Sequence, residues 1–223
     1  MTMRLVHAQE RPAERDSAGV SSSAERTAER GLVESARAGD EDAFGDLVQR
    51  RAAGVLAFLR RMLGDSEDAR DVAQLTFVRA WENLHRYDPA YAFSTWLFRI
   101  AGNLAIDALR ARRTRERTAA ENLRLVRAGP SAVAPDGPGG LSRQEVRRVF
   151  EACATVLSAK QRLVFVLREF EEKESREIAE LLGCRESTVR NHLFQARRLL
   201  RTELARRFPE YLPRPSAPPE AES

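Results

Sequence analysis

Residues 178–201, "IAELLGCRESTVRNHLFQARRLLR", contain a short apolar helical pattern, a glycine and then a longer helical pattern. In the second part, apolar residues recur at steps of four, three and four, at Val189, Leu193, Ala196 and Leu200. Such spacing places them on one face of a helix. Gly183 supplies the residue type that ends a helix at positive φ. This order predicts a helix-turn-helix, and a plain helical hairpin is the alternative.

The face opposite this stripe has a composition that suits contact with DNA. It carries no acid, and its candidate DNA-contacting residues are Ser187, Thr188, Arg190, Asn191, Phe194, Gln195 and Arg198. In a major groove, Asn and Gln can pair with adenine, Arg with guanine or phosphate, and Phe with a thymine methyl group. Arg201, Arg206 and Arg207 are expected to follow the phosphate backbone instead.

The composition of the whole chain excludes several functional classes. The 223 residues are 43% hydrophobic and 31% charged, with a net charge of +4. No apolar run approaches the roughly 20 residues of a membrane span, and the first residues lack a signal-peptide core, so we expect the cytoplasm. The two Cys and three His are scattered, and the acids are dispersed, which predicts no disulfide, metal site, cofactor or enzyme activity.

The remaining pattern predicts an all-α protein of two small helical domains joined by a flexible linker. We expect a disordered extension over 1–30, a first domain over 31–117 and a second over 141–208, the one with the helix-turn-helix. The linker, 118–140, includes "AGPSAVAPDGPGG", whose Pro and Gly content cannot build a core. Residues 209–223 are Pro-rich and are expected to be disordered. The one β-like run, "RLVFVLREF" at 162–170, is predicted to be helical from its flanking signals.

A second helix with a basic outer face is expected from near Ser94. Its buried stripe is predicted to contain Leu97, Ile100, Ala101, Leu104 and Ala108, and its outer face Arg99, Asn103, Ile106, Arg110 and Arg113. Gly102 interrupts this helix at a cost of about 1 kcal/mol relative to Ala. Tight helix packing and close approach of a nucleic-acid backbone both explain a glycine there, and the residues alone do not separate them.

Three stretches together resemble a known family. "DVAQLTFVRAWENL" (71–84), "YDPAYAFSTWLFRIAGNLAIDALRARR" (87–113) and the segment from Leu157 to Arg201 are similar to bacterial RNA polymerase sigma factors. The resemblance is to the extracytoplasmic-function class, which keeps only the second and fourth conserved regions. It implies promoter-specific initiation, with core polymerase (its clamp coiled coil and flap), promoter DNA and an anti-sigma factor as partners.

The resemblance also implies roles for individual residues of the first domain. Asp68, Asp71, Gln74 and Arg79 match positions that bind polymerase, whereas Phe77 and Trp81 are better explained as core. The loop with Tyr87, Asp88 and Tyr91 matches the one that captures a flipped base of the minus-ten element, although both tyrosines could simply pack on the helices. Arg99, Asn103, Arg110 and Arg113 are the expected minus-ten contacts on the following helix, and the helix-turn-helix residues are the expected minus-thirty-five contacts.

Three positions depart from the family pattern. Arg185 stands where a capping Ser is common, Gly102 where many members have Arg or Lys, and His192 where Arg is frequent. These differences concern individual contacts and leave the architecture unchanged. Rival functions are a stand-alone helix-turn-helix regulator, which needs no polymerase, a helical adaptor that never meets DNA, and a nucleic-acid enzyme, which would need clustered carboxylates.

Overall fold

The computed structural model describes residues 27–64, 66–122 and 142–212, and all regular secondary structure within them is helical. A first helix covers residues 27–37 and is called the N-terminal helix below. It is followed by α2 (Glu41–Leu63), α3 (Ser66–Glu82), α4 (Phe93–Asn122), α5 (Arg143–Cys153), α6 (Ala159–Glu169), α7 (Ser175–Leu182) and α8 (Glu186–Arg207). Short 3-10 turns lie at Leu84–Arg86, Ala154–Val156 and Pro209–Tyr211. The all-α prediction is confirmed.

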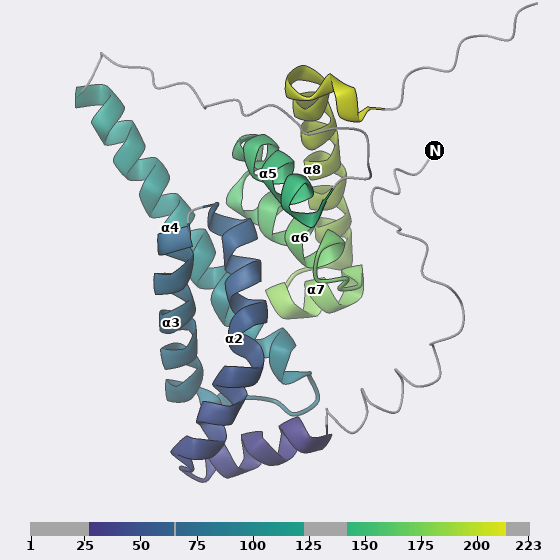
Figure 1. Cartoon of the computed structure of the whole chain (residues 1–223). Helices are drawn as coiled ribbons and strands as arrows, with labels where there is room; N and C mark the ends of the chain where they lie inside the picture. The colour runs from purple at the N-terminus through teal and green to yellow at the C-terminus, as the bar shows by residue number, and fades with distance from the viewer. Residues whose placement is uncertain (1–26, 65, 123–141, 213–223) are drawn as a thin grey trace, which may run out of the picture.

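The first region packs the N-terminal helix, α2, α3 and α4 around one core (Figure 1). Leu47, Phe58 and Leu97 are fully buried in it, and Gly64 ends α2 with φ of +76°, as its position predicts. None of the helices in the described part of the chain is long and apolar enough to span a membrane.

The first region begins four residues earlier than the expected boundary at 31. Glu29 of the N-terminal helix is only 5% exposed and forms an ion pair with Arg51 of α2 at 2.5 Å. Val33 and Ala36 of the same helix are buried in the core. A charged, polar segment therefore belongs to the fold because an ion pair and two small apolar contacts anchor it. The expected disorder of 1–26 lies outside the described residues.

The second region packs α5, α6 and α7 against the long helix α8. The β-like run lies in α6, which begins with a capping box formed by Ser158 and Gln161, so the prediction of a helix is confirmed. The region also extends past the expected boundary at 208. Tyr211 returns to α5, where its hydroxyl donates to Glu145 Oε1 at 2.8 Å.

The first region also extends further into the expected linker than the sequence predicts. Helix α4 continues to Asn122, so residues 118–122, expected in the linker, are helical. The stretch 123–141, with its Pro- and Gly-rich sequence, lies outside the described residues, as does 213–223.

The two regions are in contact along a surface that we call the seam, formed by α2 and α4 on one side and by α6, α7 and their neighbouring turns on the other. Arg61 Nη1 of α2 forms an ion pair with Glu171 Oε1 at 2.8 Å, and its guanidinium lies over the ring of Phe170. Arg162 of α6 donates from Nε to the carbonyl of Arg61 at 2.8 Å. Arg113 of α4 donates to the carbonyl of Leu157 at 2.7 Å.

The apolar part of the seam accounts for Gly102. A Cβ added at Gly102 would lie 3.0 Å from Leu163 Cδ1 and 3.3 Å from Cδ2, so α6 approaches α4 at the point where α4 has no side chain. Of the two explanations open from the sequence, the structure supports close helix packing. Ile106, predicted to lie on the outer face, is instead 8% exposed. That prediction is wrong because Ile106 lies one turn after Gly102, on the side of α4 that the second region covers.

Arg162 makes the seam electrostatically costly. It is 5% exposed, and its Nη2 has no hydrogen-bond partner among the described residues. Burial, and then the nearby cation of Arg112, lower the pKa of Arg162 to about 10. A buried guanidinium with one nitrogen left unpaired among the described residues costs free energy, which offsets part of what the other seam contacts contribute.

Candidate nucleic-acid interface

Helix α8 presents the predicted recognition face to solvent. Ser187, Thr188, Arg190, Asn191 and Arg198 are exposed, Gln195 is half-buried, and Phe194 is the most exposed large apolar side chain, at 63%. The opposite stripe of Val189, Leu193 and Ala196 is buried against the second region's core. A large apolar ring in solvent, surrounded by hydrogen-bonding groups, is compatible with the contact surface that the sequence predicts.

Local structure fixes this helix in place. Gly183 ends α7 with φ of +61°, which allows the tight turn into α8 that its position predicts. Arg185 occupies the N-cap position without a side-chain cap, and Ser187 already lies inside the helix. Glu186 in the first turn pairs with Arg190 at 3.2 Å and also favours the helix start. The helix-turn-helix is thus held by packing and by Gly183 more than by capping.

The arginines near the C-terminal end of α8 divide into two groups. Arg206 pairs with the buried Glu203 at 2.7 Å and lowers the pKa of that carboxyl group. Arg207 donates to the carbonyl of Ala152 in α5. The expectation that both follow the phosphate backbone is therefore not supported by this arrangement, in which Arg206 pairs within α8 and Arg207 ties α8 to α5. Arg201 is exposed.

Helix α4 carries the second basic face. Arg99, Asn103 and Arg110 are exposed and lie on one side of the helix, at spacings of four and seven residues. Asp107 lies between them and pairs with Arg110 at 3.8 Å, consistent with a role in orienting that arginine. Arg113 differs from these three because its guanidinium is already bound to the second region across the seam.

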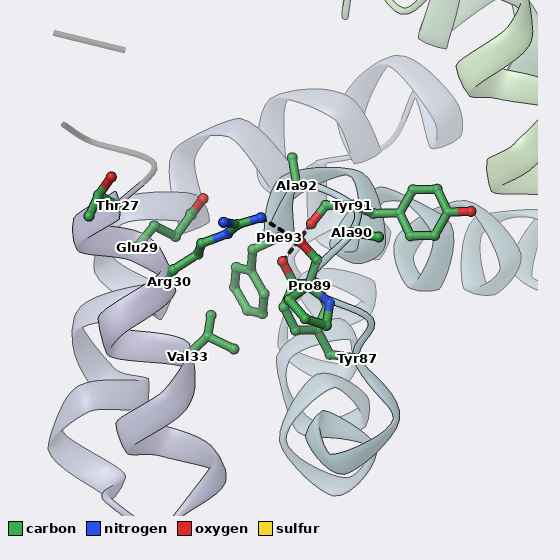
Figure 2. A pocket seen from close by; sticks show the side chains of 10 residues that line it. All are labelled: Thr27, Glu29, Arg30, Val33, Tyr87, Pro89, Ala90, Tyr91, Ala92 and Phe93. Atoms are coloured by element: carbon green, nitrogen blue, oxygen red, sulfur yellow. Dashed lines mark hydrogen bonds between the residues drawn. The ribbon is translucent and has the colours of Figure 1, made fainter. Parts of the chain in front are cut away.

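The loop between α3 and α4 holds Tyr87, Asp88 and Tyr91 in three different roles (Figure 2). Tyr87 is 5% exposed, packs on Phe93 and Trp96, and donates its hydroxyl to the carbonyl of Tyr91 at 2.6 Å. Burial raises the pKa of Tyr87, which keeps this donor protonated. In this conformation Tyr87 orders the loop and offers no ring to a base.

Asp88 and Tyr91 complete the loop. Asp88 Oδ1 accepts from the backbone N–H of Ala90 at 2.9 Å, so its side chain forms a local turn. Tyr91 is 46% exposed, and its ring points away from the neighbouring cavity (Figure 2). Of the three residues predicted to capture a base, Tyr91 alone presents a free aromatic face.

A cavity of about 360 Å³ lies between this loop and the N-terminal helix. Its walls are Thr27, Glu29, Arg30 and Val33 on the helix and residues 87 and 89–93 on the loop (Figure 2). Sequence reasoning missed the helix side because residues up to 30 were expected to be disordered. The signal available in the sequence was the three-residue spacing of Val33 and Ala36, which follow the polar segment in the chain. Two residues at helical spacing are a weak indication of a helix.

Helix α3 presents the residues expected to bind polymerase. Asp68, Asp71, Gln74 and Arg79 are all exposed, whereas Phe77 and Trp81 pack against the core, as expected from their spacing. The sequence prediction missed Leu75 and Val78, which are 41% and 51% exposed on the same helix. Two exposed apolar side chains beside acidic and amide groups form a mixed surface suited to a protein partner.

Within the described residues, no group of three or more His, Cys, Asp or Glu side chains could hold a metal ion. The two cysteines also differ in environment. Cys153 is buried, and burial raises the pKa of its thiol to about 11, while Cys184 is exposed in the turn before α8.

Comparisons with known proteins agree on one family. Residues 47–115 match Sigma-70 region 2, and residues 147–200 match Sigma-70, region 4. The ECF RNA polymerase sigma factor SigW of Bacillus subtilis is 32% identical over 180 residues, which cover 77% of this chain and 94% of SigW. The RNA polymerase sigma factor CnrH of Cupriavidus metallidurans is 38% identical over 177 residues, or 76% of this chain and 91% of CnrH. The solved structure of CnrH in complex with the cytosolic domain of CnrY superposes with a TM-score of 0.57 at 27% identity, covering 81% of this chain and 99% of that one.

Proposed function

The chain belongs to the extracytoplasmic-function class of RNA polymerase sigma factors, and we propose that three of its exposed surfaces divide promoter recognition between them. As a sigma factor, it binds core RNA polymerase and directs promoter-specific initiation. The observation that carries the assignment of surfaces is the outer face of α8, which is exposed and acid-free from Ser187 to Arg201, with Phe194 in solvent.

We assign residues 142–212 to duplex recognition of the minus-thirty-five element. Helix α8 enters the major groove with Asn191 and Gln195 suited to adenine edges and Phe194 suited to a thymine methyl group. Arg190 and Arg198 supply guanine or phosphate contacts, and Ser187 and Thr188 approach the backbone at the helix start. Helix α7 and Gly183 hold this helix at the surface.

We assign residues 27–122 to polymerase docking and to the minus-ten element. Arg99, Asn103 and Arg110 on α4 face one strand, and Arg113, which is exposed although one of its N–H groups binds the Leu157 carbonyl, extends this face by one turn. Tyr91 stacks on an unpaired base, a contact worth about 1–3 kcal/mol in other proteins. Tyr87 and Asp88 contribute by ordering the loop.

Helix α3 is the proposed docking surface for the clamp coiled coil. Asp68, Asp71, Gln74 and Arg79 form its polar part, and Leu75 and Val78 form an apolar part that we add to the sequence prediction. Substituting Leu75 and Val78 together by Ser is expected to weaken core binding while leaving helix content unchanged. Unchanged core binding would remove both residues from this surface.

We expect the protein to act in the cytoplasm with core polymerase, which contacts the second region through its flap, and to perform no catalysis itself. CnrH was solved with the cytosolic domain of CnrY, which supports a protein partner of this kind for the present chain, and we propose an anti-sigma factor. Transcription by purified factor and core in the absence of other proteins, compared with activity in cells, tests this regulation.

Run-off transcription over a promoter library, with purified core polymerase, tests the function as a whole. We expect transcripts from a defined promoter class only when both factor and core are present. Arg190→Ala together with Asn191→Ala is expected to abolish selection at the minus-thirty-five element without loss of core binding. Operator binding by a chain that forms no complex with core would instead favour the stand-alone regulator.

A further inference from the structure

The N-terminal helix is tied to the base-capturing loop by two arginines that reach across from it. Arg30 Nη2 donates to the carbonyl of Pro89 at 2.9 Å, and Arg37 Nη2 donates to the carbonyl of His85 at 3.4 Å. Figure 2 shows Arg30 extending from the N-terminal helix toward the loop at Pro89. The first of these bonds is the shorter, and it lies at the tip of the loop, two residues before Tyr91.

The other hydrogen bonds of the loop are internal to it. The hydroxyl of Tyr87 donates to the carbonyl of Tyr91, and Asp88 accepts from Ala90 N–H, so both polar side chains are already used within the loop. Arg30 therefore supplies a tie from a separate element at the tip. Such a tie reduces the loop's freedom and lowers the entropy lost when the loop orders around a bound base.

We propose that Arg30 is a positioning residue for capture of the melted minus-ten strand and that the N-terminal helix supports the loop that presents Tyr91. This proposal rests on the proposed function of the loop. Arg30 holds the Pro89 carbonyl, the loop keeps its turn, and the ring of Tyr91 stays directed outward for stacking. The N-terminal helix thus supports the loop from the side opposite to the ring of Tyr91.

The test uses holoenzyme and a fluorescent single-stranded oligonucleotide carrying the minus-ten sequence. Arg30→Ala is expected to weaken binding about fivefold, the loss typical of one hydrogen bond. Arg30→Lys is expected to restore most of it, because an ammonium group also donates to a carbonyl. Arg50→Ala, which removes an exposed arginine of α2 outside the cavity, is the charge-matched control and is expected to bind like wild type.

A salt titration separates positioning from direct contact with the strand. Because Arg30 is proposed to contact the protein backbone, the slope of log affinity against log salt is expected to be the same for Arg30→Ala and wild type. A slope smaller by about 0.7 would indicate a phosphate contact and would overturn the positioning role. Wild-type binding by Arg30→Ala with loss in Tyr91→Ala would refute this inference alone, whereas wild-type binding by both variants would refute the proposed function of the loop.

Discussion

Substituting Gly102 by Ala tests the seam, because helix propensity and packing change the free energy of unfolding in opposite directions. In the interior of an exposed helix, Ala is favoured over Gly by about 1 kcal/mol. In the structure, where α4 and α6 are in contact, the new methyl group would lie 3.0 Å from Leu163 Cδ1, closer than ordinary van der Waals contact. Overpacking of this kind costs about 1–3 kcal/mol. We therefore expect Gly102→Ala to lower the free energy of unfolding by about 0–2 kcal/mol, the difference between the two effects.

A double-mutant cycle with Leu163→Ala assigns the effect to this contact. Leu163 is 1% exposed, so Leu163→Ala alone is expected to cost about 2–5 kcal/mol. With the leucine truncated, the methyl group of Ala at position 102 has room, and the favourable helix propensity is recovered. The two changes together are expected to cost less than their sum by at least about 0.5 kcal/mol.

Urea unfolding of the full chain, followed by circular dichroism, measures both changes. If Gly102→Ala stabilises the protein by about 1 kcal/mol and its effect adds to that of Leu163→Ala, then α4 and α6 are not in contact in solution. If the effects of Gly102→Ala and Leu163→Ala on stability are additive and Gly102→Ala abolishes promoter binding, the nucleic-acid explanation of Gly102 is correct and the packing explanation is wrong.

Three further outcomes follow from individual side chains. Phe194→Ala is expected to change stability by less than about 0.5 kcal/mol, because the ring is exposed, and to weaken binding to minus-thirty-five duplex severalfold in a fluorescence titration. A thiol reagent at pH 8 is expected to modify Cys184 rapidly and Cys153 only on unfolding, as mass spectrometry can count. The hydrogen bond from Arg206 lowers the pKa of Glu203 in the folded protein below the ordinary value of 4.5. Their pair therefore stabilises the fold fully above pH 4.5, and this stabilisation is lost as the pH falls through the pKa of the folded state. Glu203→Gln is expected to make Tm less dependent on pH in this acid range.

The parts of the fold that the sequence predicted depend on local signals. Gly183 ends α7 at positive φ, and the stripe of Val189, Leu193 and Ala196 is buried. Both could be predicted because they follow from residue type and spacing within one segment. The helical state of 162–170 also followed from neighbouring signals, against its β-like composition.

What could not be predicted depends on contacts between distant segments. Ile106 is buried by a region that begins beyond the linker, and no periodicity within α4 reports that contact. Glu29 and Arg30 belong to the fold through Arg51 and Pro89, although their own segment is too polar to suggest burial. The exposure of Leu75 and Val78 likewise depends on which face of α3 the core uses.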